Sequence, residues 1–185
     1  MVGSGRIVLV GGGVRSGKSA FALFRARQLG SRRVFVATAE TLDEEMRRRV
    51  EKHQRERSAD YRTLESPREL CETLRSIEDA DVVVVDCLTL WLTNLLVAGQ
   101  SEAQIERAIE ALVALLAERH RHTILVSNEV GLGIVPDNAL ARSFRDLTGI
   151  AHQRIGVCAD EVYAGLFGQL LRLKPGPVEA QVFAP

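Results

Sequence analysis

The chain has 185 residues, 46% of them apolar and 26% charged, which fits one domain, 1–185, with a sizeable core. Lys plus Arg and Asp plus Glu both total 24, so the net charge is zero, and we expect neither a nucleic-acid nor a membrane-surface partner. No apolar run approaches the roughly 18 residues of a membrane span. The short, Gly-rich start is not typical of a signal peptide, so we expect a cytoplasmic protein. Three cysteines without CxxC spacing predict neither a disulfide framework nor a zinc site, but small buried side chains.

Apolar runs alternate with helical patterns along the chain. Strands are predicted at 6–11, 33–37, 81–86, 123–127 and 161–164, with a weaker prediction at 170–173. Helices are predicted at 18–29, at 88–97 and up to about Arg119, and capping-box patterns predict helix starts at Thr41, Ser66 and Ser101. The alternation predicts an α/β fold, a mostly parallel sheet with helices on both faces. The tail 175–185 is expected to be loose.

Residues 12–19 read GGVRSGKS and match G-x-x-x-x-G-K-[ST], after a predicted strand and before a predicted helix. The glycines let backbone N–H groups point at phosphate oxygens, and the helix N-terminus adds positive charge. Lys18 is expected to reach the β- and γ-phosphates, and Ser19 to bind Mg²⁺. Asp86 ends an all-valine strand, where an acid either binds Mg²⁺ or caps the following helix. The pattern predicts a P-loop enzyme that binds a purine nucleoside triphosphate with Mg²⁺; the alternative is a glycine-rich turn without a ligand.

Two classes of P-loop protein fit this sequence poorly. A regulatory GTPase would carry an Asn-Lys-x-Asp signature, which does not occur here, and the segment Asp86-Cys-Leu-Thr is not Asp-x-x-Gly. A DNA-dependent motor would need more length and a basic charge excess.

Two further segments are distinctive: ATAETLDEEMRRRVEKHQRER at 37–57 and VSNEVGLGIVPDN at 126–138. With the phosphate loop, they resemble the bifunctional adenosylcobinamide kinase/adenosylcobinamide-phosphate guanylyltransferases of cobalamin biosynthesis, from Ile7 to about Gly168. The resemblance implies a RecA-like P-loop fold and a homotrimer. It also implies two reactions that use ATP and GTP: phosphorylation of adenosylcobinamide, then transfer of GMP from GTP to that phosphate through a guanylylated histidine, which matches His53 here.

The resemblance also implies a set of nucleotide contacts. They are expected at Gly12, Gly13, Val14, Arg15, Ser16, Gly17, Lys18 and Ser19, at Thr38, Ala39 and Glu40, at Gln54, Arg55, Glu56 and Arg57, at Glu65, and at Asp86.

The surroundings of His53 in the sequence suit a nucleophile. Six cationic residues lie within six positions of it, and nearby positive charge lowers an imidazole pKa and keeps the ring neutral. The same cations can stabilise leaving pyrophosphate. The alternative is a solvated basic helix face, and for His152 surface or packed placement is the better interpretation.

The segment 128–138 follows a strand, where ligands of parallel sheets bind, so Asn128 and Glu129 could receive a substrate or order a water. A purely structural turn is the alternative. For the whole chain, a guanylyltransferase-only homologue and a non-catalytic GTP-binding subunit remain open.

Overall fold

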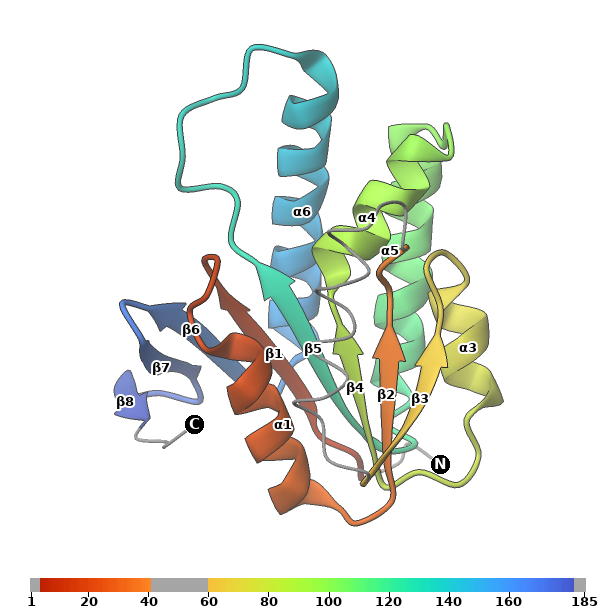
Figure 1. The fold of residues 1–185 in the computed structure, drawn as a ribbon, viewed down its shortest axis with the longest axis vertical. Coiled ribbons are helices and arrows are strands. Elements are labelled where there is room, and N and C mark those ends of the chain that lie inside the picture. Colours follow the sequence, from red (N-terminus) through yellow and green to blue (C-terminus); the bar gives the residue numbers. More distant parts are fainter. Residues whose placement is uncertain (1–3, 41–59, 182–185) are drawn as a thin grey trace.

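A computed structural model describes residues 4–40 and 60–181 and shows alternating strands and helices (Figure 1). The elements are β1 (Ile7–Gly12), α1 (Lys18–Leu29), β2 (Arg33–Ala37), β3 (Tyr61–Glu65), α3 (Leu70–Ser76), β4 (Val82–Asp86), α4 (Leu88–Val97), α5 (Glu102–Ala117), β5 (His122–Asn128), α6 (Ala139–Cys158), β6 (Glu161–Leu166), β7 (Gln169–Lys174) and β8 (Glu179–Gln181). Each predicted strand is present, within one or two residues of its predicted ends.

The strands form one sheet in the order β3-β2-β4-β5-β1-β6-β7-β8. The first six are parallel, and β7 and β8 are antiparallel additions at one side. The carboxyl ends of the parallel strands therefore meet at one edge, the upper edge in Figure 1. Ligands of open parallel sheets bind at this edge.

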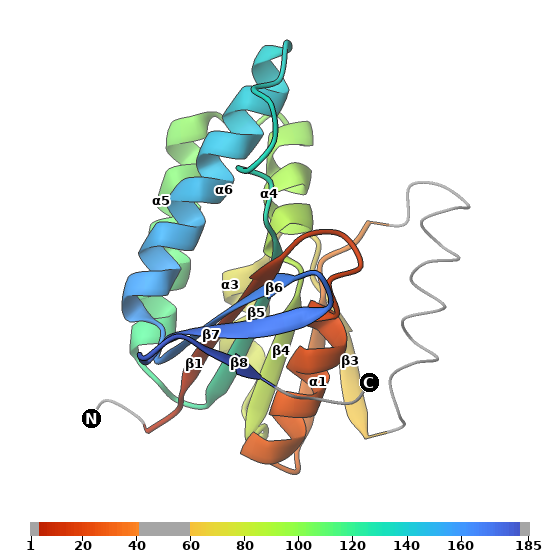
Figure 2. The ribbon, with the colours of Figure 1, turned by 90° about the vertical axis from the view of Figure 1, so that its left-hand side faces the viewer.

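Helices cover both faces of the sheet, as predicted (Figure 2). Helix α1 packs on one face against Val82 and Val84, while α3, α4, α5 and α6 pack on the other against Val83 and Val85. Because side chains alternate along a strand, the four valines of β4 serve both layers. In the described ranges, no helix has both the length and the apolar character to cross a membrane.

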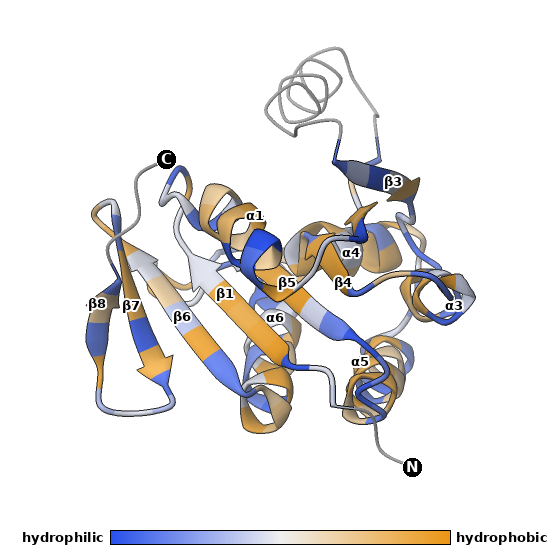
Figure 3. Ribbon diagram, turned by 90° about the horizontal axis from the view of Figure 1, so that it is seen from below, coloured by the Kyte–Doolittle hydropathy of each residue, from blue (hydrophilic) through white to orange (hydrophobic). Residues whose placement is uncertain are grey.

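Three local predictions differ from the structure. Strand β3 was not predicted, because it is an edge strand whose residues are half-buried or exposed and largely hydrophilic (Figure 3). Ser66 does not cap a helix: α3 begins at Leu70, and the buried Ser66 hydroxyl accepts a hydrogen bond from Thr73 at 2.8 Å. Residues 179–181 of the tail, expected to be loose, pair with β7 as strand β8.

Two other local predictions can be compared with the described residues. The capping box at Ser101 and Gln104 is confirmed. The cysteines are all free; Cys87 is buried, whereas Cys71 and Cys158 are half-buried beside the core.

Glu161, at the start of β6, carries a buried carboxylate. Arg6, Arg25 and Tyr163 donate hydrogen bonds of 2.6–3.0 Å to it. Burial by itself would raise the pKa of this carboxyl, but these hydrogen bonds and the guanidinium charge of Arg25 lower the pKa to about 2. The ionised group therefore stabilises the fold above its unfolded pKa of about 4.5, and this contribution is lost as the pH falls toward 2.

We expect Glu161→Gln to lower the free energy of unfolding by about 3 kcal/mol at pH 7, because it leaves Arg25 without its anionic partner. Urea titrations across pH 7 to pH 2 should show the difference from wild type shrinking below about pH 4.5. The control Glu179→Gln removes a more exposed ion pair with Arg172 and should cost less than about 1 kcal/mol. A Glu161→Gln effect that is equally large at every pH would contradict this assignment.

Candidate nucleotide-binding site

The loop between β1 and α1 has the backbone shape that its glycines allow. Gly12 and Gly17 adopt φ angles of 155° and 86°, in the region that disfavours side chains. A Cβ on Gly12 would lie 2.7 Å from the Ser16 hydroxyl and 2.8 Å from the Gly165 carbonyl, so no side chain fits there. The loop closes tightly, with the Ser16 amide donating to the Gly13 carbonyl at 3.3 Å, and leads directly into the first turn of α1.

Two buried polar groups lie within this loop. The Lys18 side chain folds over it, and its Nζ donates to the Gly13 carbonyl at 3.1 Å. Burial lowers the pKa of Lys18, against the raising effects of Cys87 and Asp86. The Ser16 hydroxyl is buried and has no hydrogen-bond partner in the described part of the chain. The Lys18 ammonium has a charge that the surrounding protein groups only partly balance, and the Ser16 hydroxyl lacks a hydrogen-bond partner among the described residues. Such a pair of groups suits an anionic ligand such as a phosphate.

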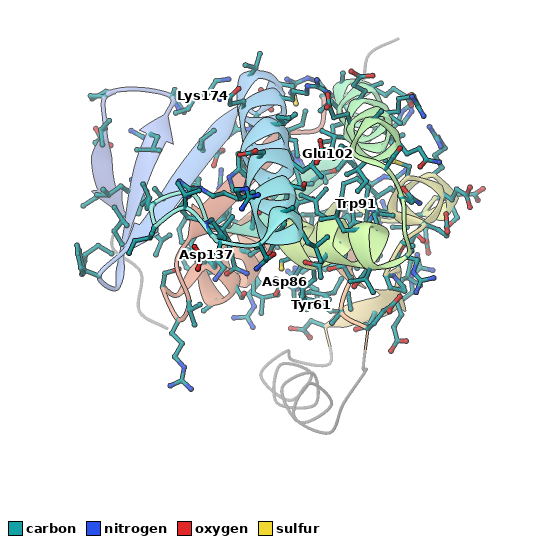
Figure 4. The ribbon with its side chains drawn as sticks, turned by 90° about the horizontal axis from the view of Figure 1, so that it is seen from above. Tyr61, Asp86, Trp91, Glu102, Asp137 and Lys174 are labelled. Atoms are coloured by element: carbon teal, nitrogen blue, oxygen red, sulfur yellow. The ribbon has the colours of Figure 1, made fainter. Side chains whose placement is uncertain are left out.

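Asp86 ends β4 at the same edge of the sheet. The alternation of the strand places it on the face covered by α1, with Val82 and Val84, and its charge acts on Lys18. Figure 4 looks down on this edge, with Asp86 near the middle of the molecule and Lys174 at its periphery. Ser19, half-buried in the first turn of α1, is the other predicted ligand. A hydroxyl and one carboxylate fit Mg²⁺, which usually takes its other ligands from phosphates and water.

Residues 38–40 and Glu65, which were predicted to contact nucleotide, lie at this edge of the sheet. The side chains of Thr38 and Glu40 bond to other groups of the protein. Thr38 is fully buried, and its hydroxyl donates to the Cys87 carbonyl at 2.7 Å and accepts from the Cys87 amide at 2.8 Å. Glu40 pairs with Arg68 at 2.8 Å. Ala39 is half-buried, and Glu65 is exposed at the end of β3. Thr38 thus ties the ends of β2 and β4 together. His53 and Gln54, Arg55, Glu56 and Arg57 lie outside the described residues.

The segment after β5 is joined to the phosphate loop. The Glu129 amide donates to the Gly12 carbonyl at 3.0 Å, and the Asn128 side-chain amide donates to the Thr89 hydroxyl at 3.0 Å. Two arginines of α6 fasten the loop that follows: Arg145 donates to the Gly131 carbonyl at 2.7 Å, and Arg142 donates to the Pro136 and Asp137 carbonyls.

One contact was not foreseeable from the sequence. His152 of α6 lies 2.7 Å, through Nε2, from the hydroxyl of Ser127, and its Nδ1 lies 3.8 Å from Glu129. The helical pattern around His152 indicates only that it faces the sheet or solvent. Its partners depend on how α6 crosses β5, which no local signal encodes.

The fold and the loop together define a RecA-like P-loop protein. A solved structure of the RadB recombinase is similar, with a TM-score of 0.51 over 97% of this chain and 83% of that one, at 15% sequence identity. The particular family follows from the sequence: the family model for cobinamide kinase / cobinamide phosphate guanyltransferase matches residues 8–173, and the chain belongs to this family.

Curated relatives agree with this assignment. The chain is 43% identical to the bifunctional adenosylcobalamin biosynthesis protein CobP of Pseudomonas aeruginosa, over 92% of this chain and 98% of the relative. It is 39% identical to the bifunctional protein CobU of Salmonella typhimurium, over 91% and 99% respectively. The predicted enzyme class, a kinase combined with a nucleotidyltransferase, is thereby confirmed at the level of the family.

Proposed function

We propose that this protein phosphorylates the aminopropanol hydroxyl of adenosylcobinamide and then transfers GMP from GTP to that phosphate, giving adenosylcobinamide-GDP and pyrophosphate. The observation that carries the proposal is the placement of Lys18 in a phosphate loop beside Asp86, in a chain of this family. Membership supplies the pair of reactions, and the loop supplies the means to bind a triphosphate.

In the first reaction, ATP or GTP donates its γ-phosphoryl group. Lys18 neutralises the β- and γ-phosphates, and the loop amides hold them in place. Ser19 and Asp86 would hold Mg²⁺, which supplies further neutralisation of phosphate charge. Phosphoryl transfer needs positioning and charge neutralisation more than covalent catalysis, and these residues provide both.

In the second reaction, a neutral His53 nitrogen attacks the α-phosphorus of GTP. A nitrogen–phosphorus bond forms, the bond to the β-phosphate bridge breaks, and pyrophosphate leaves. An oxygen of adenosylcobinamide phosphate then attacks the same phosphorus and displaces His53. Two steps suit a reaction between two anions, because pyrophosphate departs before the second phosphate enters.

The test is product formation by the purified protein from adenosylcobinamide, ATP, GTP and Mg²⁺. Mass spectrometry should detect adenosylcobinamide phosphate and then adenosylcobinamide-GDP, with one pyrophosphate released per GMP transferred. A guanylyltransferase-only homologue would act on supplied adenosylcobinamide phosphate alone. A GTP-binding subunit would release no pyrophosphate.

We also propose a homotrimer, which rests on the family resemblance. Light scattering at micromolar concentration should give about three times the chain mass of 20.4 kDa. A monomer mass throughout the accessible concentration range would contradict this assembly.

A further inference from the structure

Strand β5 lies between the two parts of the proposed nucleotide site. It pairs on one side with β4, where Asp86 faces Val126, and on the other with β1, where Gly12 faces Asn128. The chain that continues past Asn128 therefore leaves the sheet between the phosphate loop and the proposed Mg²⁺ ligand. The γ-phosphate of a nucleotide in the loop, and the hydroxyl that accepts it, must lie in the same region.

The first residue in that position is Glu129. Its amide is bonded to Gly12 at 3.0 Å, which fixes its backbone beside the loop. One carboxylate oxygen accepts a hydrogen bond from the Gly131 amide at 2.5 Å. The side chain remains 36% exposed, so a substrate can reach it.

Three other acidic residues at this edge are less suited to contact the acceptor hydroxyl. Glu40 is paired with Arg68 at 2.8 Å. Glu65 ends β3, from which β2, β4 and β5 separate the phosphate-loop strand. Asp86 is assigned to Mg²⁺ in the proposed function.

The carboxylate of Glu129 has an oriented imidazole beside it. Ser127 points to the opposite face of the sheet from Val126, and its fully buried hydroxyl lies 2.7 Å from His152 Nε2. The other ring nitrogen lies 3.8 Å from the second oxygen of Glu129. Burial lowers the pKa of His152, against the raising effect of Glu129, which favours a neutral ring. A neutral ring that accepts from Ser127 carries its proton on Nδ1, toward Glu129.

We propose that Glu129 is the general base of the phosphoryl-transfer step, and that His152, held by Ser127, is the residue that positions its carboxylate. This inference rests on the proposed kinase activity and adds the group that takes up the substrate proton. The acceptor hydroxyl gives its proton to Glu129 as its oxygen bonds to the γ-phosphorus. The bond from the γ-phosphorus to the bridging oxygen breaks, and ADP leaves with that electron pair. Glu129 then releases the proton to solvent.

The test uses Glu129→Gln, which keeps an oxygen for the Gly131 amide but cannot take a proton. We expect kcat for ATP-dependent phosphorylation of adenosylcobinamide to fall about 100-fold or more, while KM for ATP changes less than about 3-fold. ATP affinity by calorimetry and protein labelling by α-labelled GTP should both persist. Glu129→Asp should restore part of kcat. The control Glu118→Gln makes the same change at the opposite edge of the sheet, and kcat should not change.

The positioning role of His152 has its own readout. His152→Asn should lower kcat for phosphorylation about 10-fold and leave KM for ATP unchanged, since an orienting contact matters mainly in the transition state. In the double variant, His152→Asn should lower kcat little beyond the effect of Glu129→Gln alone, because both changes act through the carboxylate of Glu129.

Three results would overturn the proposal: a Glu129→Gln enzyme that keeps at least about a third of wild-type kcat, parallel loss of ATP affinity or GTP labelling, or full additivity of the two changes. A wild-type protein that phosphorylates no adenosylcobinamide would reject the proposed kinase function itself, and this inference with it.

Discussion

Lys18→Ala is expected to weaken binding of ATP and of GTP about 10- to 100-fold, because it removes the cation that we propose bonds to phosphate oxygens. Turnover in both reactions should fall further, since the ammonium also stabilises charge that develops during transfer. The fold should survive. Burial lowers the pKa of Lys18, so the charged side chain costs the nucleotide-free protein stability at neutral pH. The nucleotide-free variant should therefore stay folded, with an unfolding temperature close to that of wild type.

Two measurements check this expectation. Calorimetric titration with each triphosphate gives the affinity, and thermal unfolding with and without nucleotide gives the stabilisation by ligand, which should largely disappear in Lys18→Ala. The control Lys174→Ala changes a lysine that donates to the Gly156 and Val157 carbonyls at the periphery, and nucleotide affinity should stay at the wild-type value. Wild-type affinity in folded Lys18→Ala would remove the phosphate-loop assignment.

His53→Asn is expected to abolish transfer of GMP, because Asn keeps a similar size and some hydrogen bonding but lacks the nucleophilic nitrogen. Wild-type protein incubated with GTP and Mg²⁺ should retain an α label and not a γ label. The bond should be labile in acid and comparatively stable in base, as expected for a phosphoramidate. His53→Asn should take up no label.

The phosphate loop is unchanged in this variant, so ATP-dependent phosphorylation of adenosylcobinamide should persist at least in part. This residual activity serves as the internal control for folding. Retained α-labelling in His53→Asn would place the nucleophile on another residue, and His152 would be the next histidine to replace.

Sequence patterns predicted the elements whose signal is local. The strands β1 and β4 are continuous apolar runs, and the Ser101 capping box marks the start of α5. Strand β3 has no such signal, because Tyr61, Thr63 and Glu65 do not form a buried face. This strand forms by parallel pairing with β2. Capping at Ser66 failed because its hydroxyl bonds to Thr73 within the fold instead.

The candidate site likewise has parts that local sequence patterns predict and parts that they do not. The phosphate loop is one contiguous segment, so its residues and their order predict its shape. The contact of Thr38 with nucleotide stays a prediction; its hydroxyl joins β2 to β4 through Cys87, a partner 49 residues away that no local pattern indicates. Contacts such as Ser127 with His152 depend on how α6 packs across the sheet, and no periodicity within either segment encodes them.

The most direct test of the whole account is transfer from the isolated covalent intermediate. Wild-type protein labelled with α-labelled GTP and freed of nucleotide should pass its label to added adenosylcobinamide phosphate, giving labelled adenosylcobinamide-GDP in proportion to the label lost from protein. The account would be contradicted if the label stayed on the protein. It would also be contradicted if the label left only as GMP while the same protein, given unlabelled GTP, still formed unlabelled adenosylcobinamide-GDP.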